Sequence, residues 1–229
     1  MPPKRKAATT INETVIVPRR LKIAKKKQTT ALAKTFNEKS KHWFEKYTDA
    51  DNRELIGPDG CQAFFNDIGV SLESALPLVI GYKMKSIRMG YITWEEWLSV
   101  MKPELYFEED GRFALAVLEW ERSIMSNEEE YKQFYLFSFN YAKSNGQKSM
   151  DIETATAIWH IILEKKYPIV KSFIEFVQVV KPVQVINKDQ WSSMLDFCKA
   201  VPEDLQNYDS TSSWPVLFDD YVEWRQQSL

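Results

Sequence analysis

Beyond residue 40, apolar side chains recur at intervals of three and four positions, which is the spacing of helices that bury one face. The chain has only seven glycines in 229 residues, which favours helices over glycine-cornered barrels and phosphate-binding loops. The predicted helical segments are residues 42–47, 59–68, 71–85, 93–101, 113–125, 127–143, 151–162, 167–180, 188–201 and 214–224. We therefore predict an all-α fold.

Capping residues mark the start of several of these segments. Thr93 and Glu96 have the spacing of a capping box, in which each side chain accepts a hydrogen bond from the other residue's backbone N–H. Ser71 and Asp151 are predicted to cap the segments that follow them. The aromatic segment 127–143 invites a ligand-pocket interpretation, but interior packing is preferred because Phe and Tyr dominate protein cores.

Residues 1–34 lack apolar periodicity, so we predict a disordered basic tail ahead of one domain at residues 35–229. Residues 1–28 contain nine Lys and Arg and one Glu, a charge of +8, so the remainder carries −10 of the total −2. The basic cluster of Lys4, Arg5 and Lys6 is typical of a nuclear-import signal. The alternative is a solvated basic tail that no import receptor binds. Nucleic-acid binding is a weaker interpretation, because phosphate attraction alone would be nonspecific.

Two loops can be aligned with EF-hand calcium loops, but neither has the full ligand set. With Ile92 at position 8, Glu96 falls at position 12, yet Lys, Ile and Met occupy ligand positions 1, 3 and 5. With Ile56 at position 8, Asp49 falls at position 1, but Gly60 replaces the bidentate Glu at position 12. We predict an EF-hand-like scaffold that pairs helices through short extended segments without metal. A calcium-responsive interaction scaffold is the alternative function.

Catalysis by this chain is not expected. The only histidines, His42 and His160, lie in no recognisable motif, and the chain has no G-x-S-x-G, P-loop, CxxC or HExxH pattern. Cys61 and Cys198 are read as small apolar side chains rather than nucleophiles. Two cysteines without a signal peptide suit a reducing compartment, and no apolar run is long enough to cross a bilayer. A soluble intracellular protein is expected.

The run W-P-V-L-F-D-D at residues 214–220 is the most specific piece of a wider pattern. The pattern includes N-K-D-Q-W at 187–191, N-Y-D at 207–209, I-G-P-D-G at 56–60, M-G-Y at 89–91 and F-N-Y-A-K at 139–143. In order and spacing, the chain from about residue 40 to its end resembles the defective-in-cullin-neddylation family.

The resemblance implies a helical domain of two EF-hand-like subdomains that bind no calcium. It also implies a non-catalytic role, without a cofactor, in the ligation of a ubiquitin-like modifier to cullins. One surface would hold the C-terminal winged-helix region of a cullin, and another the acetylated N-terminus of the neddylation conjugating enzyme. The basic N-terminus is similar to that of short nuclear members without a ubiquitin-binding domain. We expect a monomer located in the nucleus, with the cytoplasm as a second compartment.

By alignment of motifs, the cullin-binding positions of the family fall on Asp189, Ser213 and Asp219. Two exposed carboxylates would pair with basic cullin side chains. Ser213 replaces an Ala of the family, and we expect slightly weaker or unchanged binding. The alternatives are local: Asp189 could cap its helix, and Asp219 could simply be solvated.

The family's pocket for the acetylated methionine matches twelve positions that are apolar or small. These are Pro58, Cys61, Leu72, Pro77, Leu78, Gly81, Met84, Met89, Gly90, Ile92, Ile158 and Ile161. Acetylation removes an ammonium charge whose burial would be costly, so an apolar pocket can recognise the modification. Ordinary core packing is the alternative, above all for Leu78 and Ile92. Pro58, Pro77 and Gly81 differ in size from the family's residues, so the choice of conjugating enzyme stays open.

Overall fold

The computed structural model describes residues 36–102 and 111–227. The predicted import signal, Lys4 with Arg5 and Lys6, and the predicted domain boundary after residue 34 lie outside these ranges. The described residues from Ser40 onwards belong to one compact unit. Within the described ranges, no helix is both long and apolar enough to cross a membrane.

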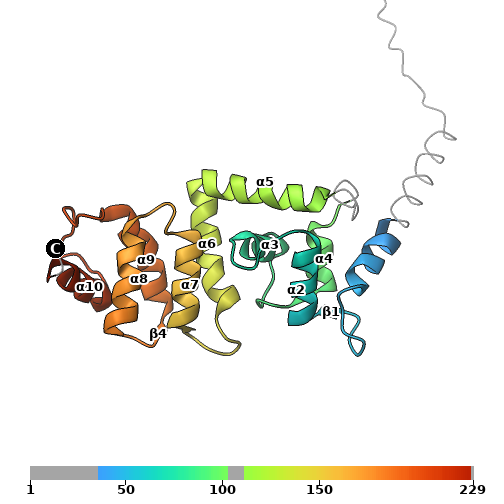
Figure 1. Cartoon of the computed structure of the whole chain (residues 1–229), viewed down its shortest axis with the longest axis horizontal. Helices are drawn as coiled ribbons and strands as arrows, with labels where there is room; N and C mark the ends of the chain where they lie inside the picture. Colours follow the sequence, from blue (N-terminus) through green and yellow to red (C-terminus); the bar gives the residue numbers. More distant parts are fainter. Residues whose placement is uncertain (1–35, 103–110, 228–229) are drawn as a thin grey trace, which may run out of the picture. The chain divides into compact units, whose positions relative to one another are not determined.

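Helices account for nearly all the regular structure of the described residues, which confirms the predicted all-α fold class (Figure 1). Residues 40–45 are helical at the start of the compact unit. The helices that follow are α2 (Pro58–Asp67), α3 (Leu76–Met84), α4 (Trp94–Val100), α5 (Arg112–Ser126), α6 (Glu128–Ala142), α7 (Ile152–Ile162), α8 (Ile169–Val180), α9 (Lys188–Ala200) and α10 (Val216–Gln227).

Four two-residue strands join the helices in pairs. Strand β1 (Leu55–Ile56) pairs antiparallel with β2 (Ile92–Thr93), so that Ile56 lies opposite Ile92. Strand β3 (Met150–Asp151) pairs in the same way with β4 (Val185–Ile186). Each sheet therefore links two helix–loop–helix segments through short extended stretches, and those at Ile56 and Ile92 were predicted.

The predicted caps are confirmed at two helices and wrong at a third. Thr93 and Glu96 form the capping box of α4, and Asp151 accepts a 2.7 Å hydrogen bond from the N–H of Thr154 at the start of α7. Ser71 does not begin a helix, because α3 starts at Leu76, and residues 71–74 form a turn. Pro77 lies in the first turn of α3, where its missing N–H leaves no helical bond unmade.

Helix α6 packs in the interior, as preferred for its aromatic pattern. It contacts α3 and α5 as well as α7 and α9 (Figure 1). The Tyr135 ring stacks on Trp191 at 4.8 Å, and Trp159 stacks on Trp191 at 5.6 Å. The polar atoms of these rings are also paired: the Trp159 indole N–H donates to the Tyr135 hydroxyl, which donates to the carbonyl of Trp191. The buried stack thus joins α6, α7 and α9 without leaving these polar groups unsatisfied.

Candidate functional site

Asp189 lies on the exposed first turn of α9 and is not the cap of that helix. The cap is Asn187, whose side chain accepts a 2.9 Å hydrogen bond from the Gln190 N–H, while Gln190 accepts one from the Asn187 N–H at 3.0 Å. Since this capping box satisfies the helix start, the Asp189 carboxylate is left to face solvent near the positive end of the helix dipole.

Asp219 is half-buried in the first turn of α10 rather than freely solvated. Its carboxylate accepts a short hydrogen bond from the hydroxyl of Tyr208. Partial burial raises the pKa of Tyr208 above its ordinary value, and the hydrogen bond to the Asp219 carboxylate raises this pKa further. The phenol therefore stays protonated and donates this hydrogen bond. Ser213 is exposed and follows a turn that is held by the side chain of Asp209.

Helices α9 and α10 meet around Phe197, whose ring lies 4.9 Å from Phe218 and 5.4 Å from Trp214. Asp189 precedes Phe197 by eight residues, which is about 12 Å of helical rise. In the described part of the chain, no hydrogen bond or ion pair joins Asp189 to Ser213 or Asp219. Asp189 therefore lies on α9 and Asp219 on α10, two helices that meet around Phe197, and Ser213 lies in the segment before α10.

The twelve predicted pocket positions divide by exposure. Six are buried, namely Cys61, Leu78, Gly81, Met84, Ile92 and Ile158. Three are half-buried, namely Pro77, Gly90 and Ile161, and three are exposed, namely Pro58, Leu72 and Met89. Met84 is only 1% exposed, whereas Leu72 and Met89 are 48% and 45% exposed. The deep positions are packed shut, so a guest side chain could reach them only if neighbouring groups moved.

Tyr141 of α6 lies among the predicted pocket residues, although sequence reasoning assigned it to ordinary packing. A Cβ atom placed on Gly81 would lie 2.5 Å from its ring, so Gly81 and Tyr141 are in close contact. The carbonyl of Tyr141 accepts a 3.0 Å hydrogen bond from the N–H of Met89. Burial, with smaller effects from Cys61 and Glu96, raises the pKa of Tyr141. The F-N-Y-A-K motif contained this residue, but only tertiary contacts show what it touches.

Glu96 organises the loop between α3 and α4. One of its carboxylate oxygens accepts from the N–H of Ile87 at 2.9 Å, and the other accepts from the N–H of Thr93 at 2.8 Å. In an EF-hand the residue at this loop position supplies both oxygens to calcium. Here both carboxylate oxygens of Glu96 accept hydrogen bonds from backbone N–H groups, so the carboxylate stabilises the loop where a metal ion would do so in an EF-hand.

The two thiols are poor candidates for nucleophiles. Burial, with a smaller effect from the Glu96 charge, raises the pKa of Cys61 to about 12. Burial raises the pKa of Cys198 as well. Thiolates are therefore scarce at neutral pH. Among the described residues, no group of three or more His, Cys, Asp and Glu side chains could hold a metal ion.

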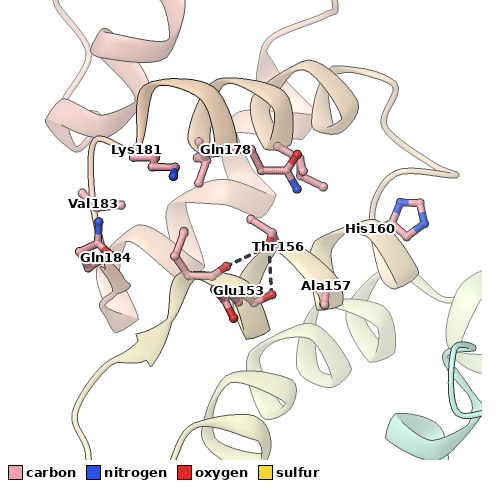
Figure 2. Close-up of a pocket in the computed structure, with 11 residues that line it drawn as sticks. Glu153, Thr156, Ala157, His160, Gln178, Lys181, Val183 and Gln184 are labelled. Atoms are coloured by element: carbon pink, nitrogen blue, oxygen red, sulfur yellow. Dashed lines mark hydrogen bonds between the residues drawn. The ribbon is translucent and has the colours of Figure 1, made fainter.

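A separate cavity of about 600 Å³ lies between α7 and α8 (Figure 2). Ile174, Val177 and Val183 contribute apolar side chains, and Glu153, Gln178 and Lys181 contribute polar ones. Figure 2 shows the Thr156 hydroxyl bonded to two carbonyls of its own helix, those of Ile152 and Glu153. The cavity contains none of the predicted site residues.

Comparison with known proteins places the chain in a family. Residues 113–224 match a family model described as cullin binding. DCN1-like protein 4 of Drosophila melanogaster is 38% identical over 182 residues, which cover 80% of this chain and 72% of that protein. DCN1-like protein 4 of Danio rerio is 33% identical over 229 residues, with coverages of 98% and 80%. DCN1-like protein 5 of Rattus norvegicus is 35% identical over 187 residues, with coverages of 80% and 76%. The chain therefore belongs to the DCN1-like protein family.

Proposed function

We propose that this chain is a non-catalytic cofactor of cullin neddylation, which acts as a nuclear monomer and brings a cullin and the neddylation conjugating enzyme together. The observation that carries the proposal is the match of residues 113–224 to a cullin-binding family, because Asp189, Ser213 and Asp219 all fall inside it. Tethering two partners on one domain makes their encounter effectively intramolecular, which accelerates transfer without an acid or base from the adaptor.

The local geometry supports a cullin-binding role for Asp189. Its carboxylate is exposed and is not needed for capping, so a basic partner side chain can pair with it at little structural cost. Asp219 would act differently, because Tyr208 holds its carboxylate in one orientation. The charge of −10 outside the basic tail would steer a basic surface towards both residues.

For the conjugating enzyme, we propose that the acetylated methionine enters the apolar region around Met84. This region is closed in the structure, so binding requires the Tyr141 ring to move from Gly81 or the Met89 segment to shift. A shift of the Met89 segment would have to break or carry along the 3.0 Å bond from the Met89 N–H to the backbone carbonyl of Tyr141. A flexible Met84 side chain can adapt to the guest.

We further propose that the two strand-paired halves are EF-hand-like units that work without metal. The use of both Glu96 oxygens by backbone N–H groups supports this proposal over the calcium-responsive alternative. A calcium sensor would melt at a higher temperature in calcium, since a ligand that binds only the native state stabilises it. We expect an unchanged melting temperature.

The cullin surface is tested by charge reversal. We expect Asp189→Arg to reduce capture of a cullin C-terminal winged-helix domain at least about tenfold, which corresponds to about 1.4 kcal/mol. Glu175→Arg, on the exposed side of α8, makes the same charge change and serves as the matched control. Circular dichroism should show both variants folded. Undiminished capture by Asp189→Arg would refute the assignment of this surface.

The pocket is tested by titration with an N-terminal peptide of the conjugating enzyme. We expect the acetylated peptide to bind at least about tenfold more tightly than the unacetylated peptide, because the latter must bury an ammonium group. Isothermal titration calorimetry measures both affinities. Equal affinities would reject the pocket assignment while leaving the cullin surface untouched.

A further inference from the structure

A cavity of about 370 Å³ lies where the loop after α3 meets the end of α6. Ser86 and Arg88 line it from the loop, and Asn140 and Lys143 line it from the end of α6. Tyr141 forms part of its wall, but none of the twelve predicted methionine-pocket residues lines it. Neither surface of the proposed function accounts for this cavity.

The charged residues that line the cavity are cationic. Of the described residues that line it, two are cationic, Arg88 and Lys143, and none is Asp or Glu. Both cationic groups are held in place: the Lys143 ammonium donates to the Gln147 carbonyl at 2.8 Å, and the Arg88 guanidinium lies 3.7 Å from the centre of the Tyr91 ring. The ammonium keeps two further donors, and the guanidinium has five in total.

Ser86 provides a second, independent indication of a ligand. Its residue is 2% exposed, and its hydroxyl has no hydrogen-bond partner among the described residues. The backbone of Ser86 is anchored by a 2.9 Å bond from its N–H to the Gly81 carbonyl. Because buried polar groups are nearly always paired, an orphaned hydroxyl at the wall of a cationic cavity indicates a missing acceptor.

The neighbouring carboxylate of Glu96 does not supply that acceptor. Its two oxygens accept from the N–H groups of Ile87 and Thr93. The apolar part of the wall is formed by Phe137 and Tyr141, whose rings stack at 5.1 Å. The cavity thus combines cationic donors, a hydroxyl donor and a flat apolar side.

We propose that this cavity is an oxyanion subsite for a carboxylate or phosphate group carried on a peptide side chain. Arg88 and Lys143 bind the charge, the Ser86 and Asn140 side chains donate further hydrogen bonds, and the stacked rings contact the aliphatic part of the ligand side chain. The subsite lies away from the proposed cullin-binding residues and borders, through Tyr141, the region proposed for the acetylated methionine.

Inorganic phosphate is the first probe, titrated into the full chain at constant ionic strength and followed by the amide resonances of residues 86–88 and 140–145. We expect saturable shifts confined to these residues, and about tenfold weaker binding by the Arg88→Gln/Lys143→Gln variant. Lys132→Gln/Lys171→Gln makes the same charge change at exposed positions on α6 and α8 that do not line the cavity, and it should bind as the wild type does. Phosphoserine and glutamate peptides then distinguish a phosphate ligand from a carboxylate ligand.

Ser86→Ala separates binding from folding. Since the substitution removes an unpaired buried hydroxyl, the variant should be at least as stable as the wild type and yet bind phosphate more weakly. Shifts spread over the surface lysines, or binding that survives in Arg88→Gln/Lys143→Gln, would indicate an adventitious ion only and overturn the proposal. Failure of phosphate and of both peptides to bind would also overturn it, without bearing on cullin capture.

Discussion

At the scale of single residues, the contact between Gly81 and Tyr141 shows why a helix interior contains a glycine. Glycine within a helix is about 0.5–1 kcal/mol less favourable than alanine, so some other contact must favour it at this position. In α3 that contact is the Tyr141 ring, which lies where a Cβ atom would be. The contact lies among the residues proposed to receive the acetylated methionine.

Gly81→Ala should therefore lower the free energy of unfolding by about 1–3 kcal/mol, despite the better helix propensity of alanine, because the ring must shift. Urea denaturation followed by circular dichroism measures the change. The added Cβ would also meet the tyrosine hydroxyl oxygen, at 2.7 Å. Gly81→Ala/Tyr141→Phe should for that reason recover part of the loss. Wild-type stability in Gly81→Ala would contradict the contact.

At the scale of elements, the first turn of α9 contains residues that cap the helix beside a residue that is left available to a partner. Asn187 and Gln190 satisfy the first backbone donors reciprocally. Asp189 lies between them in sequence, but it is exposed and makes no capping bond. Its carboxylate contributes only through the helix dipole, and it remains available to a partner.

Asn187→Ala should lower the free energy of unfolding by about 1 kcal/mol, because the cap is lost. Asp189→Ala should lower it by no more than about 0.5 kcal/mol, because an exposed charge at a helix start contributes little. Chemical denaturation of the two variants side by side decides the assignment. If Asp189→Ala proved the more destabilising, Asp189 would be the structural residue and the proposed cullin contact would need another carboxylate.

At the scale of the whole molecule, buried tyrosines tie the fold to the protonation state of their phenols. Burial raises the pKa of Tyr131, Tyr135 and Tyr141 above the ordinary value of 10.0. A group whose pKa is raised by folding contributes stability that is fully present below its unfolded pKa and is lost as pH rises through its folded pKa. These three phenols therefore favour the folded state at neutral pH and oppose it above about pH 10.

Among the ten tyrosines of the chain, the buried phenols of Tyr131, Tyr135 and Tyr141 should ionise in an alkaline titration only above pH 10, and only together with the loss of helical circular dichroism. Ultraviolet absorbance of the phenolate follows the ionisation. Ionisation of all ten near pH 10, with the helices intact, would show that the aromatic interior is open to water.

Local chemistry made much of the fold predictable. The capping box at Thr93, the cap at Asp151 and the helical periodicity of α6 depend on residues within one or two turns of each other, and these predictions are confirmed. The predicted start of α3 was wrong, because Ser71 lies at the beginning of a turn and the helix begins only at Leu76, next to Pro77. Short extended segments were predicted near Ile56 and Ile92, whereas the register that places these two residues opposite each other comes from the structure.

By itself, the sequence determined the helical class, the positions of most helices and the family resemblance, because periodicity, caps and motifs depend on residues that are close together in the chain. Only the tertiary structure decided that Tyr208 holds Asp219, that Tyr141 closes on Gly81, and that Ser86 lacks a partner beside Arg88. Tyr141 and Gly81 are sixty residues apart in the chain, and all three features depend on how packed elements meet. No local pattern of residues encodes such a meeting.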